Sequence, residues 1–328
     1  MKIVVTGGAG FIGANLCREL SSRPEVRTVV ALDNLSTGDA RNLNGIDAEL
    51  VEGSILDRQA LRETVTDADA VIHLAARPSV PRSVADPIAS HEANATGTIY
   101  VLEACRRAGA PLIAASSSSV YGPTVELPKH EEMPTKPQSP YAASKLAAES
   151  YLLAFAATYG IRTLPFRFFN VYGPLQSSGH AYAAAIPSFI DAALNGKLIR
   201  IDGDGLQTRD FTFVGTVVRI LADAAIRKVT SRTPVNLAFG TRHSILDVVG
   251  KIEKIIGRPV EVVHDSPRPG DVRDSQAANH ILRELFPGHT PTPLEQGLTA
   301  TVAWYRERLQ SDLQLARQRA APDSFVLR

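Results

Sequence analysis

The chain has 328 residues, of which 44% are hydrophobic, enough for one large domain or two ordinary domains with cores of their own. Its 35 Lys and Arg residues are nearly balanced by 34 Asp and Glu residues, so the net charge gives no support to a nucleic acid or membrane partner. Cys17 and Cys105 are too few for a disulfide framework or a zinc site, and the scattered histidines predict no metal centre.

Short runs rich in β-branched residues alternate with helical patterns through the first half. The predicted strands are residues 2–6, 28–33, 48–53, 70–75 and 111–116, with helical patterns between them at ANLCREL, around 57–66 and over 87–109. Strands that are apolar on both faces and alternate with helices predict a parallel sheet covered by helices, a doubly wound α/β domain. No segment reaches the ~18 apolar residues of a membrane helix, and MKIVVTGG is typical of a strand rather than a signal peptide. We therefore expect a cytoplasmic protein.

The second half begins with a long helix. Ala, Leu and Lys at helical spacing predict a helix from Pro140 to Tyr159. After about residue 170, Gly- and Pro-rich loops separate shorter elements. We therefore predict a dinucleotide-binding domain over residues 1–170 and a smaller substrate-binding domain over 171–328, with some elements of the second packing on the first. The polar stretch 309–328 is expected to be a frayed helix or disordered.

A glycine-rich turn follows the first strand. Gly7, Gly10 and Gly13 stand between a predicted strand and a predicted helix, where backbone N–H groups can approach a pyrophosphate at the helix N-terminus. Asp33 follows Gly13 by 20 residues, at the end of the second strand, where a carboxylate holds the adenosine ribose and repels a 2′-phosphate. The pattern predicts a Rossmann-type domain that binds NAD. The alternative for Asp33 is a turn former in DNLSTG.

Tyr141 and Lys145 lie one turn apart on the predicted long helix, so their side chains share a face. A tyrosine that acts as a base near neutral pH needs its pKa lowered, which a nearby ammonium can do. By itself this spacing is common on surface helices. After a glycine loop and a ribose carboxylate, it favours a catalytic pair.

These motifs come in a fixed order along nearly the whole chain: TGGAGFIG, LDNLSTG, HLAA, NATGT, SSSSVYG, YAASK, RFFNVYGP, GDGLQTRDF and RPGDVRDS. In this the chain resembles the extended short-chain dehydrogenases/reductases of the nucleotide-sugar epimerase/dehydratase group. The resemblance implies that Tyr141 takes a proton from the sugar O4 while C4 gives a hydride to NAD⁺. Lys145 would hold the nicotinamide ribose, and Ser117 would hydrogen-bond the reacting hydroxyl.

The resemblance also implies two sets of binding residues. Cofactor contacts are expected from Gly7, Gly10, Phe11, Ile12, Gly13, Asp33, Asn34, Ser36, Thr37, Gly38, Ser54, Ile55, Leu74, Ala75, Ala76, Asn94, Tyr141, Lys145 and Phe168. Substrate contacts are expected from Ser79, Ser117, Ser118, Tyr141, Asn170, Ala184, Ala185, Ile201, Arg209, Arg268, Asp271 and Ser275. At Ser54 many relatives carry an aspartate for the adenine amine.

Two serines bear on the reaction. Dehydratases of the group resemble one another in an acidic residue or pair directly after the catalytic Ser or Thr, and decarboxylases usually carry a glutamate at the position of Ser119. Here Ser118 and Ser119 follow Ser117, and an ordinary hydroxyl is a poor acid or base. The remaining reaction is oxidation at C4, rotation of the keto sugar and return of the hydride, which predicts a UDP-hexose 4-epimerase.

The sugar is predicted from one pocket residue. Ser275 matches a position where a tyrosine restricts relatives to glucose and galactose, whereas a small residue leaves room for an N-acetyl group. We expect UDP-GlcNAc/UDP-GalNAc as substrates, with UDP-Glc/UDP-Gal also accepted. UDP-glucuronate epimerases share a small residue here but usually carry an arginine in the loop that here reads LQSSGH, in which only His180 is basic.

Two other classes remain as alternatives, a dehydratase or 4-keto reductase on the same fold and a non-catalytic NAD-sensing protein. The intact set of Ser117, Tyr141 and Lys145 argues against the second. Relatives commonly form homodimers through two helices of each subunit, and the Ala-rich face of the 140–159 helix is compatible with that.

Overall fold

The computed structural model describes residues 1–179, 184–267 and 272–320, with side chains to residue 311 in the last helix. In the described residues, seven parallel strands form the main sheet, in the spatial order β11-β6-β5-β4-β1-β2-β3. They are β1 (Lys2–Thr6), β2 (Thr28–Asp33), β3 (Glu49–Glu52), β4 (Ala70–His73), β5 (Leu112–Ser117), β6 (Thr163–Phe168) and β11 (Val235–Leu237). Because all seven run the same way, their carboxyl ends meet at one edge, where open α/β sheets bind ligands.

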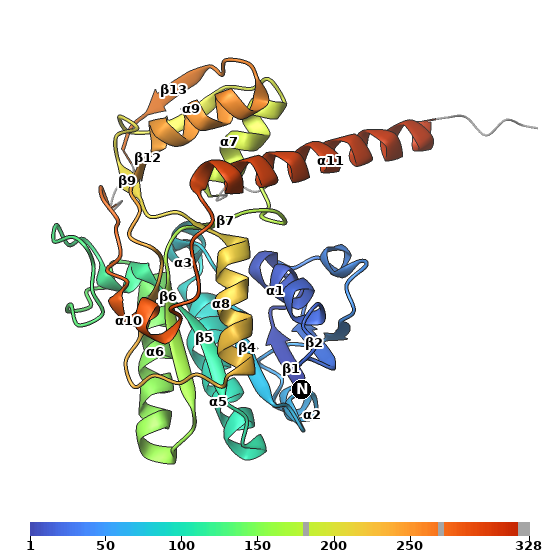
Figure 1. Ribbon diagram of the computed structural model, residues 1–328, viewed down its shortest axis with the longest axis vertical. Helices are drawn as coiled ribbons and strands as arrows, with labels where there is room; N and C mark the ends of the chain where they lie inside the picture. Colours follow the sequence, from blue (N-terminus) through green and yellow to red (C-terminus); the bar gives the residue numbers. More distant parts are fainter. Residues whose placement is uncertain (180–183, 268–271, 321–328) are drawn as a thin grey trace, which may run out of the picture.

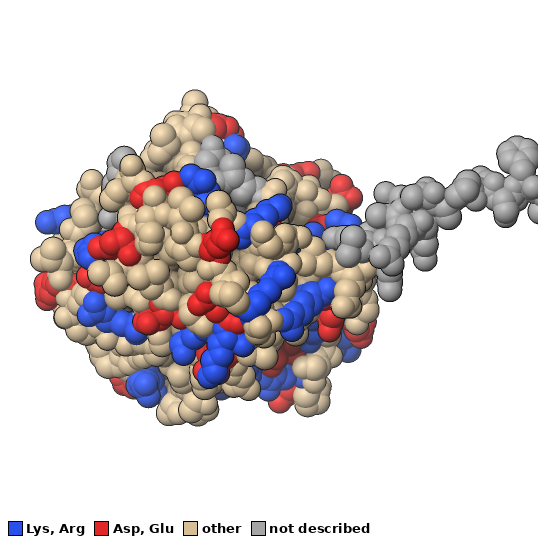
Figure 2. All heavy atoms as spheres, turned by 90° about the horizontal axis from the view of Figure 1, so that it is seen from above, with Lys and Arg blue, Asp and Glu red and all other residues tan. Residues whose placement is uncertain are grey.

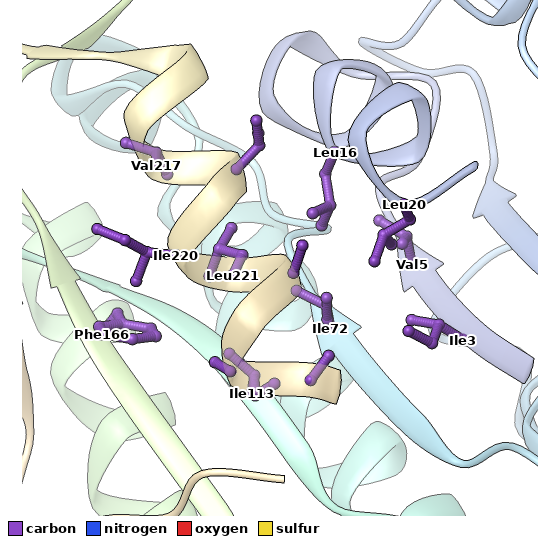
Figure 3. Close-up of a cluster of buried hydrophobic side chains, with 14 of the residues drawn as sticks. Ile3, Val5, Leu16, Leu20, Ile72, Ile113, Phe166, Val217, Ile220 and Leu221 are labelled. Carbon is purple, nitrogen blue, oxygen red and sulfur yellow. The ribbon is translucent and has the colours of Figure 1, made fainter. Parts of the chain in front are cut away.

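Helices cover both faces of this sheet, because alternate residues of each strand point to opposite sides. One face packs against α1 (Phe11–Ser21) and α8 (Val214–Ile226). Figure 3 shows Val217, Ile220 and Leu221 of α8 in the same apolar cluster as Ile72 and Ile113 of the strands. The other face packs against α2 (Arg58–Val65), α5 (Gly97–Ala108) and α6 (Pro140–Tyr159). The predicted doubly wound, Rossmann-type fold is confirmed.

Short elements link these layers at the ligand-binding edge and around it. They are the 3₁₀ turns η1 (Ala40–Leu43) and η3 (Ser118–Tyr121), the helices α3 (Val80–Ala85), α4 (Pro87–His91) and α10 (His280–Leu285), and the π-helical turn η2 (Glu92–Thr96).

A second group of elements lies beyond the carboxyl ends of the strands, at the top of Figure 1. It contains α7 (Ala185–Leu194), α9 (Ile245–Ile256) and the beginning of α11 (Leu294–Ala320), which share an apolar cluster of their own. Three two-stranded sheets accompany them: β8 (Ile199–Asp202) with β13 (Val262–Asp265), β7 (Val171–Tyr172) with β10 (Thr212–Phe213), and β9 (Thr208–Arg209) with β12 (His243–Ser244).

The predicted strands agree with the structure to within one or two residues at their ends, whereas α1 begins three residues before the predicted ANLCREL and the pattern over 87–109 divides into α4, η2 and α5. The long helix spans Pro140–Tyr159 as predicted, because Ser139 caps it by accepting a hydrogen bond from the Ala142 N–H and Gly160 ends it with a φ of +68°. Two strands of the main sheet, β6 and β11, were not among the predicted strands. Residues 309–320 belong to α11, whereas 321–328 lie outside the described residues.

The charged side chains are distributed over the surface rather than gathered by sign. Figure 2 shows Lys and Arg side chains interspersed with Asp and Glu side chains on the face that it presents. Within the part of the chain that the structure describes, no helix is long and apolar enough to cross a bilayer.

Candidate active site

The glycine turn between β1 and α1 has the shape that a pyrophosphate requires. Gly7 has a φ of +71°, a conformation that favours glycine. A Cβ at Gly13 would lie 2.0 Å from the Gly7 carbonyl oxygen, so the start of the helix packs on the turn only without a side chain. Gly10, the N-cap of α1, offers no side chain to cap the helix, which leaves N–H groups of the first turn for a ligand. The turn therefore fits the pyrophosphate of a dinucleotide.

Asp33 ends β2 beside this turn, and 7% of it is exposed. One carboxylate oxygen accepts a hydrogen bond from the Ala9 N–H (3.0 Å) and the other from the Leu35 N–H (2.8 Å). A Cβ at Gly38 would lie 2.9 Å from both oxygens, so the following loop approaches them closely. Asp33 therefore shapes a turn, and its carboxylate lies beside the glycine turn, while its contact with a ribose remains a prediction.

Other predicted cofactor positions surround the turn. Ala75 approaches it, since a Cβ at Gly7 would lie 2.7 Å from the Ala75 nitrogen. Ser54 uses its hydroxyl locally, accepting a hydrogen bond from the Leu56 N–H (3.1 Å). Asn94 is 1% exposed, and its side chain accepts a hydrogen bond from the Arg77 N–H and donates one to Ser144 Oγ (2.9 Å). The Asn94 amide therefore ties η2 to the helix of Tyr141.

The predicted catalytic residues meet at the carboxyl edge of the sheet. Ser117 is the last residue of β5, and Tyr141 lies in the first turn of α6, which packs on that strand. The Ser117 side chain hydrogen-bonds the Tyr141 hydroxyl. Lys145 follows one turn later and is 5% exposed. The sequence-predicted set is therefore assembled at one place.

Burial controls the charges of this set. It raises the pKa of Tyr141, while the hydrogen bond from Ser117 acts in the opposite direction. Burial also lowers the pKa of Lys145 to about 8, although the carboxylate of Glu149 raises it. The shift of Tyr141 is opposite to the one that the resemblance implies, because the removal of the phenol from water outweighs its polar partners.

Glu149 is a residue that the sequence reasoning did not single out. It lies one turn after Lys145 on α6, is 3% exposed, and forms a two-pronged ion pair with Arg167 of β6, at 2.7 and 3.0 Å. Ser116 Oγ donates a third hydrogen bond to the carboxylate (2.6 Å). The i, i+4 spacing from Lys145 was the available signal. This pair joins the helix of Tyr141 to two strands.

His73 is a second residue that was not predicted. Thr98 Oγ donates a hydrogen bond to the Asn94 carbonyl, so it accepts one from His73 Nε2 (3.0 Å), and His73 Nδ1 then accepts from Thr6 Oγ1 (2.6 Å). This pattern fixes the neutral Nε2–H tautomer. Burial, and to a smaller extent the charge of Lys145, lower the pKa of His73 to about 3. His73 therefore adds no positive charge beside Lys145.

A cavity of about 380 Å³ lies among the elements of the second group, beyond the end of β6. Five predicted substrate residues line it: Asn170, Ala184, Ala185, Ile201 and Arg209. Tyr172, Gln207 and Phe211 also line it and were not predicted. The cavity combines apolar walls with an arginine, as a nucleotide diphosphate requires.

Several predicted substrate positions lie away from the lining of this cavity. Ser118 begins η3 directly after Ser117. Ser79 caps α3 with an unusual φ of +99°. Ser275 is 6% exposed, and its N–H donates to the carbonyl of Thr208, next to Arg209. Arg268, Asp271 and His180 lie outside the described residues. Among the described residues, no group of three His, Cys, Asp or Glu side chains could hold a metal ion.

Comparison with known proteins agrees with this geometry. The profile of the NAD dependent epimerase/dehydratase family matches residues 3–238. The chain is 36% identical to a UDP-glucose 4-epimerase of Mycolicibacterium smegmatis, over 94% of this chain and 100% of that protein. It is also 34% identical to a dTDP-glucose 4,6-dehydratase of the same organism, over 93% of each chain.

A solved structure shares the fold. The UDP-N-acetylglucosamine 4-epimerase of Methanobrevibacter ruminantium, in complex with UDP-N-acetylmuramic acid, superposes with a TM-score of 0.88 at 34% identity, over 94% of this chain and 98% of that one. The extent of these matches, together with the glycine turn and Asp33, shows that the chain belongs to the NAD-dependent epimerase/dehydratase family and uses NAD as its cofactor.

Proposed function

We propose that the protein is a UDP-hexose 4-epimerase. The observation that carries this proposal is the hydrogen bond of 2.8 Å from Ser119 Oγ to Ser117 Oγ. It places a hydroxyl beside the catalytic serine, at the position where dehydratases and decarboxylases of the group usually carry a carboxylate. Ser118, which begins the same turn, also carries only a hydroxyl, so neither residue that follows Ser117 can serve as an added acid or base.

In the proposed reaction Tyr141 is the base that takes the proton from the sugar O4. Ser117 donates a hydrogen bond to the Tyr141 oxygen, and the same O–H is proposed to be shared with the sugar O4 when the substrate is bound. Lys145, buried one turn along α6, holds the ribose next to the nicotinamide and adds a positive charge that favours the phenolate. The glycine turn, Asp33 and Lys145 would hold NAD⁺, which would supply a hydride acceptor for the oxidation at C4 and the hydride donor for the reduction of the other face of the 4-keto sugar.

The nucleotide end of the substrate is proposed to occupy the cavity of about 380 Å³. Arg209 lines it and can meet the diphosphate with several N–H donors. Asn170 supplies a polar contact, and Ile201 and Ala185 supply apolar ones. The proposed contacts of Arg268 and Asp271 with the diphosphate remain predictions, since both lie outside the described residues.

The sugar is proposed to be N-acetylglucosamine or N-acetylgalactosamine, with glucose and galactose also accepted. Ser275 supports this, because its small side chain is buried next to the strand of Arg209, and the resemblance implies that a small residue at this position leaves room beside the sugar C2. The protein with a TM-score of 0.88 is itself a UDP-N-acetylglucosamine 4-epimerase.

A side-by-side assay tests the proposed function. Purified protein is incubated with UDP-GlcNAc or with UDP-glucuronate, and the products are followed by NMR. An equilibrium of the two C4 epimers of UDP-GlcNAc is expected, with turnover well above that of UDP-glucuronate. A stable 4-keto product would identify a dehydratase, and faster turnover of UDP-glucuronate would overturn the sugar assignment. As a matched variant, Ser275→Tyr is expected to lose UDP-GlcNAc turnover while it keeps UDP-Glc turnover.

We further propose that the protein is a cytoplasmic homodimer whose residues 1–170 and 171–328 form the cofactor and substrate domains. Val84, Ile88 and Tyr151 support the dimer, because these apolar side chains of α3, α4 and α6 are 66%, 71% and 42% exposed on neighbouring helices. Light scattering after gel filtration is expected to give twice the mass of 35.2 kDa. The free thiols of Cys17 and Cys105 are in keeping with a reducing compartment.

A further inference from the structure

The hydrogen bonds around Ser117 determine where its proton points. A serine hydroxyl offers one O–H donor and two acceptor lone pairs. Ser117 Oγ accepts from the Ser119 N–H (3.2 Å) and from the Ser119 hydroxyl (2.8 Å). Both lone pairs of Ser117 Oγ therefore accept hydrogen bonds from Ser119. The hydrogen bond between Ser117 and Tyr141 is then donated by the Ser117 O–H.

We propose that Ser119 is a positioning residue that saturates the acceptor sites of Ser117 and so directs the Ser117 proton to the Tyr141 oxygen. This inference rests on the proposed function in one respect, the role of Tyr141 as a base. A Ser117 hydroxyl that can only donate cannot accept a hydrogen bond from the Tyr141 O–H, so it stabilises the phenolate more than the phenol. The hydrogen bond from the Ser119 N–H to Ser117 Oγ is by itself an ordinary cap of η3. The hydrogen bond from the Ser119 hydroxyl fills the second acceptor site of Ser117 Oγ.

The remaining groups around Tyr141 do not depend on Ser119. Lys145 and Glu149 follow on α6, His73 is held neutral at the end of β4, and Ser83 of α3 accepts the Tyr141 backbone N–H (3.0 Å). A variant at position 119 therefore changes only the donors to Ser117. Ser119→Ala removes one of them and lets Ser117 accept from the phenol, whereas Ser119→Thr keeps a hydroxyl in place.

The test is the titration of Tyr141 in the NAD-loaded protein, read from tyrosinate absorbance as the difference from Tyr141→Phe. Ser119→Ala is expected to raise the midpoint by about half to one pH unit, a threefold to tenfold loss of phenolate at a given lower pH. Ser119→Thr is expected to keep the wild-type midpoint. An unchanged midpoint in Ser119→Ala would overturn the inference.

Kinetics give a second reading. The acidic limb of the kcat–pH profile of Ser119→Ala is expected to move to higher pH by the same amount. At pH values above this limb, kcat should equal that of the wild type, and KM should stay within about twofold of the wild-type value. An equal loss of kcat at every pH would mean that Ser119 is merely structural and would contradict the proposal. If the protein does not epimerise any UDP-hexose but the absorbance midpoint still moves, the proposed function fails and the positioning role of Ser119 stands.

Discussion

The ion pair of Glu149 and Arg167 leads to a prediction about both stability and catalysis. The two side chains are 3% and 4% exposed, and the pair is joined by two hydrogen bonds. Glu149→Gln keeps the shape of the side chain but leaves the Arg167 charge buried without a counter-charge. Removal of one partner of such a pair costs about 3–5 kcal/mol. This corresponds to a fall of roughly 5–15 °C in the melting temperature.

The same substitution should also change the ionisation of the site. Glu149 raises the pKa of Lys145, which lies near 8 in the folded protein. In Glu149→Gln the Lys145 ammonium should therefore lose its proton at a lower pH, and the alkaline limb of kcat should move toward neutrality. Both effects come from one carboxylate, so they are expected together.

Urea unfolding and the pH profile of kcat are the assays. Glu103→Gln is the matched control, because Glu103 pairs with two arginines on the surface of α5 and is expected to change stability by less than about 1 kcal/mol. The double variant Glu149→Leu, Arg167→Met should recover most of the lost stability, since it removes both charges of the pair. If Glu149→Gln were as stable as the Glu103→Gln control, the reasoning about the buried pair would be refuted.

Three further predictions concern other residues. Tyr141→Phe is expected to reduce kcat by about 100- to 10,000-fold without weakening the binding of UDP in calorimetry, and a smaller effect on kcat would exclude it as the base. The folded pKa of His73 near 3 lies below its unfolded value of 6.5, so the unfolded state binds the extra proton as the pH falls. His73 should therefore cost the wild type about 2 kcal/mol of stability between pH 7.5 and 5. This pH dependence should be absent from the stability curve of His73→Gln, so it should appear in the difference between the wild-type and variant curves. Gly13→Ala places a Cβ 2.0 Å from the Gly7 oxygen, so the purified variant should retain less NAD by absorbance after denaturation, and full retention would contradict the assigned turn.

The sequence predicted the order and boundaries of the elements that carry the cofactor. Continuous β-branched apolar runs indicate a parallel sheet, glycines indicate its first turn, and helical spacing indicates the helix of Tyr141, so β1, β2 and that helix were predicted within one or two residues. The strands β6 and β11 were missed. β6 contains Pro165 and Arg167, which depart from a strand pattern, and the Arg167 charge is compatible with burial only because Glu149 lies opposite.

The sequence predicted which residues form the candidate site, but it did not predict their burial, their pKa shifts or their hydrogen-bond partners. Spacing on one helix brought Tyr141 and Lys145 together, and motif order added Ser117. The net effect of burial on Tyr141 and the tautomer of His73 depend on partners distant in the chain, such as Thr98 for His73. Such partners leave no local pattern in the sequence.

The most direct test of the 4-epimerase proposal is the incubation of the protein with UDP-GlcNAc in D₂O, followed by proton NMR. Because the hydride is removed and returned at C4 without an added base at C5, the account predicts a mixture of the two C4 epimers with no deuterium at C4 or C5. Deuterium at C5 would show that a proton is removed from C5, and accumulation of a 4-keto sugar would show that the hydride is not returned to C4. Either result would contradict the account.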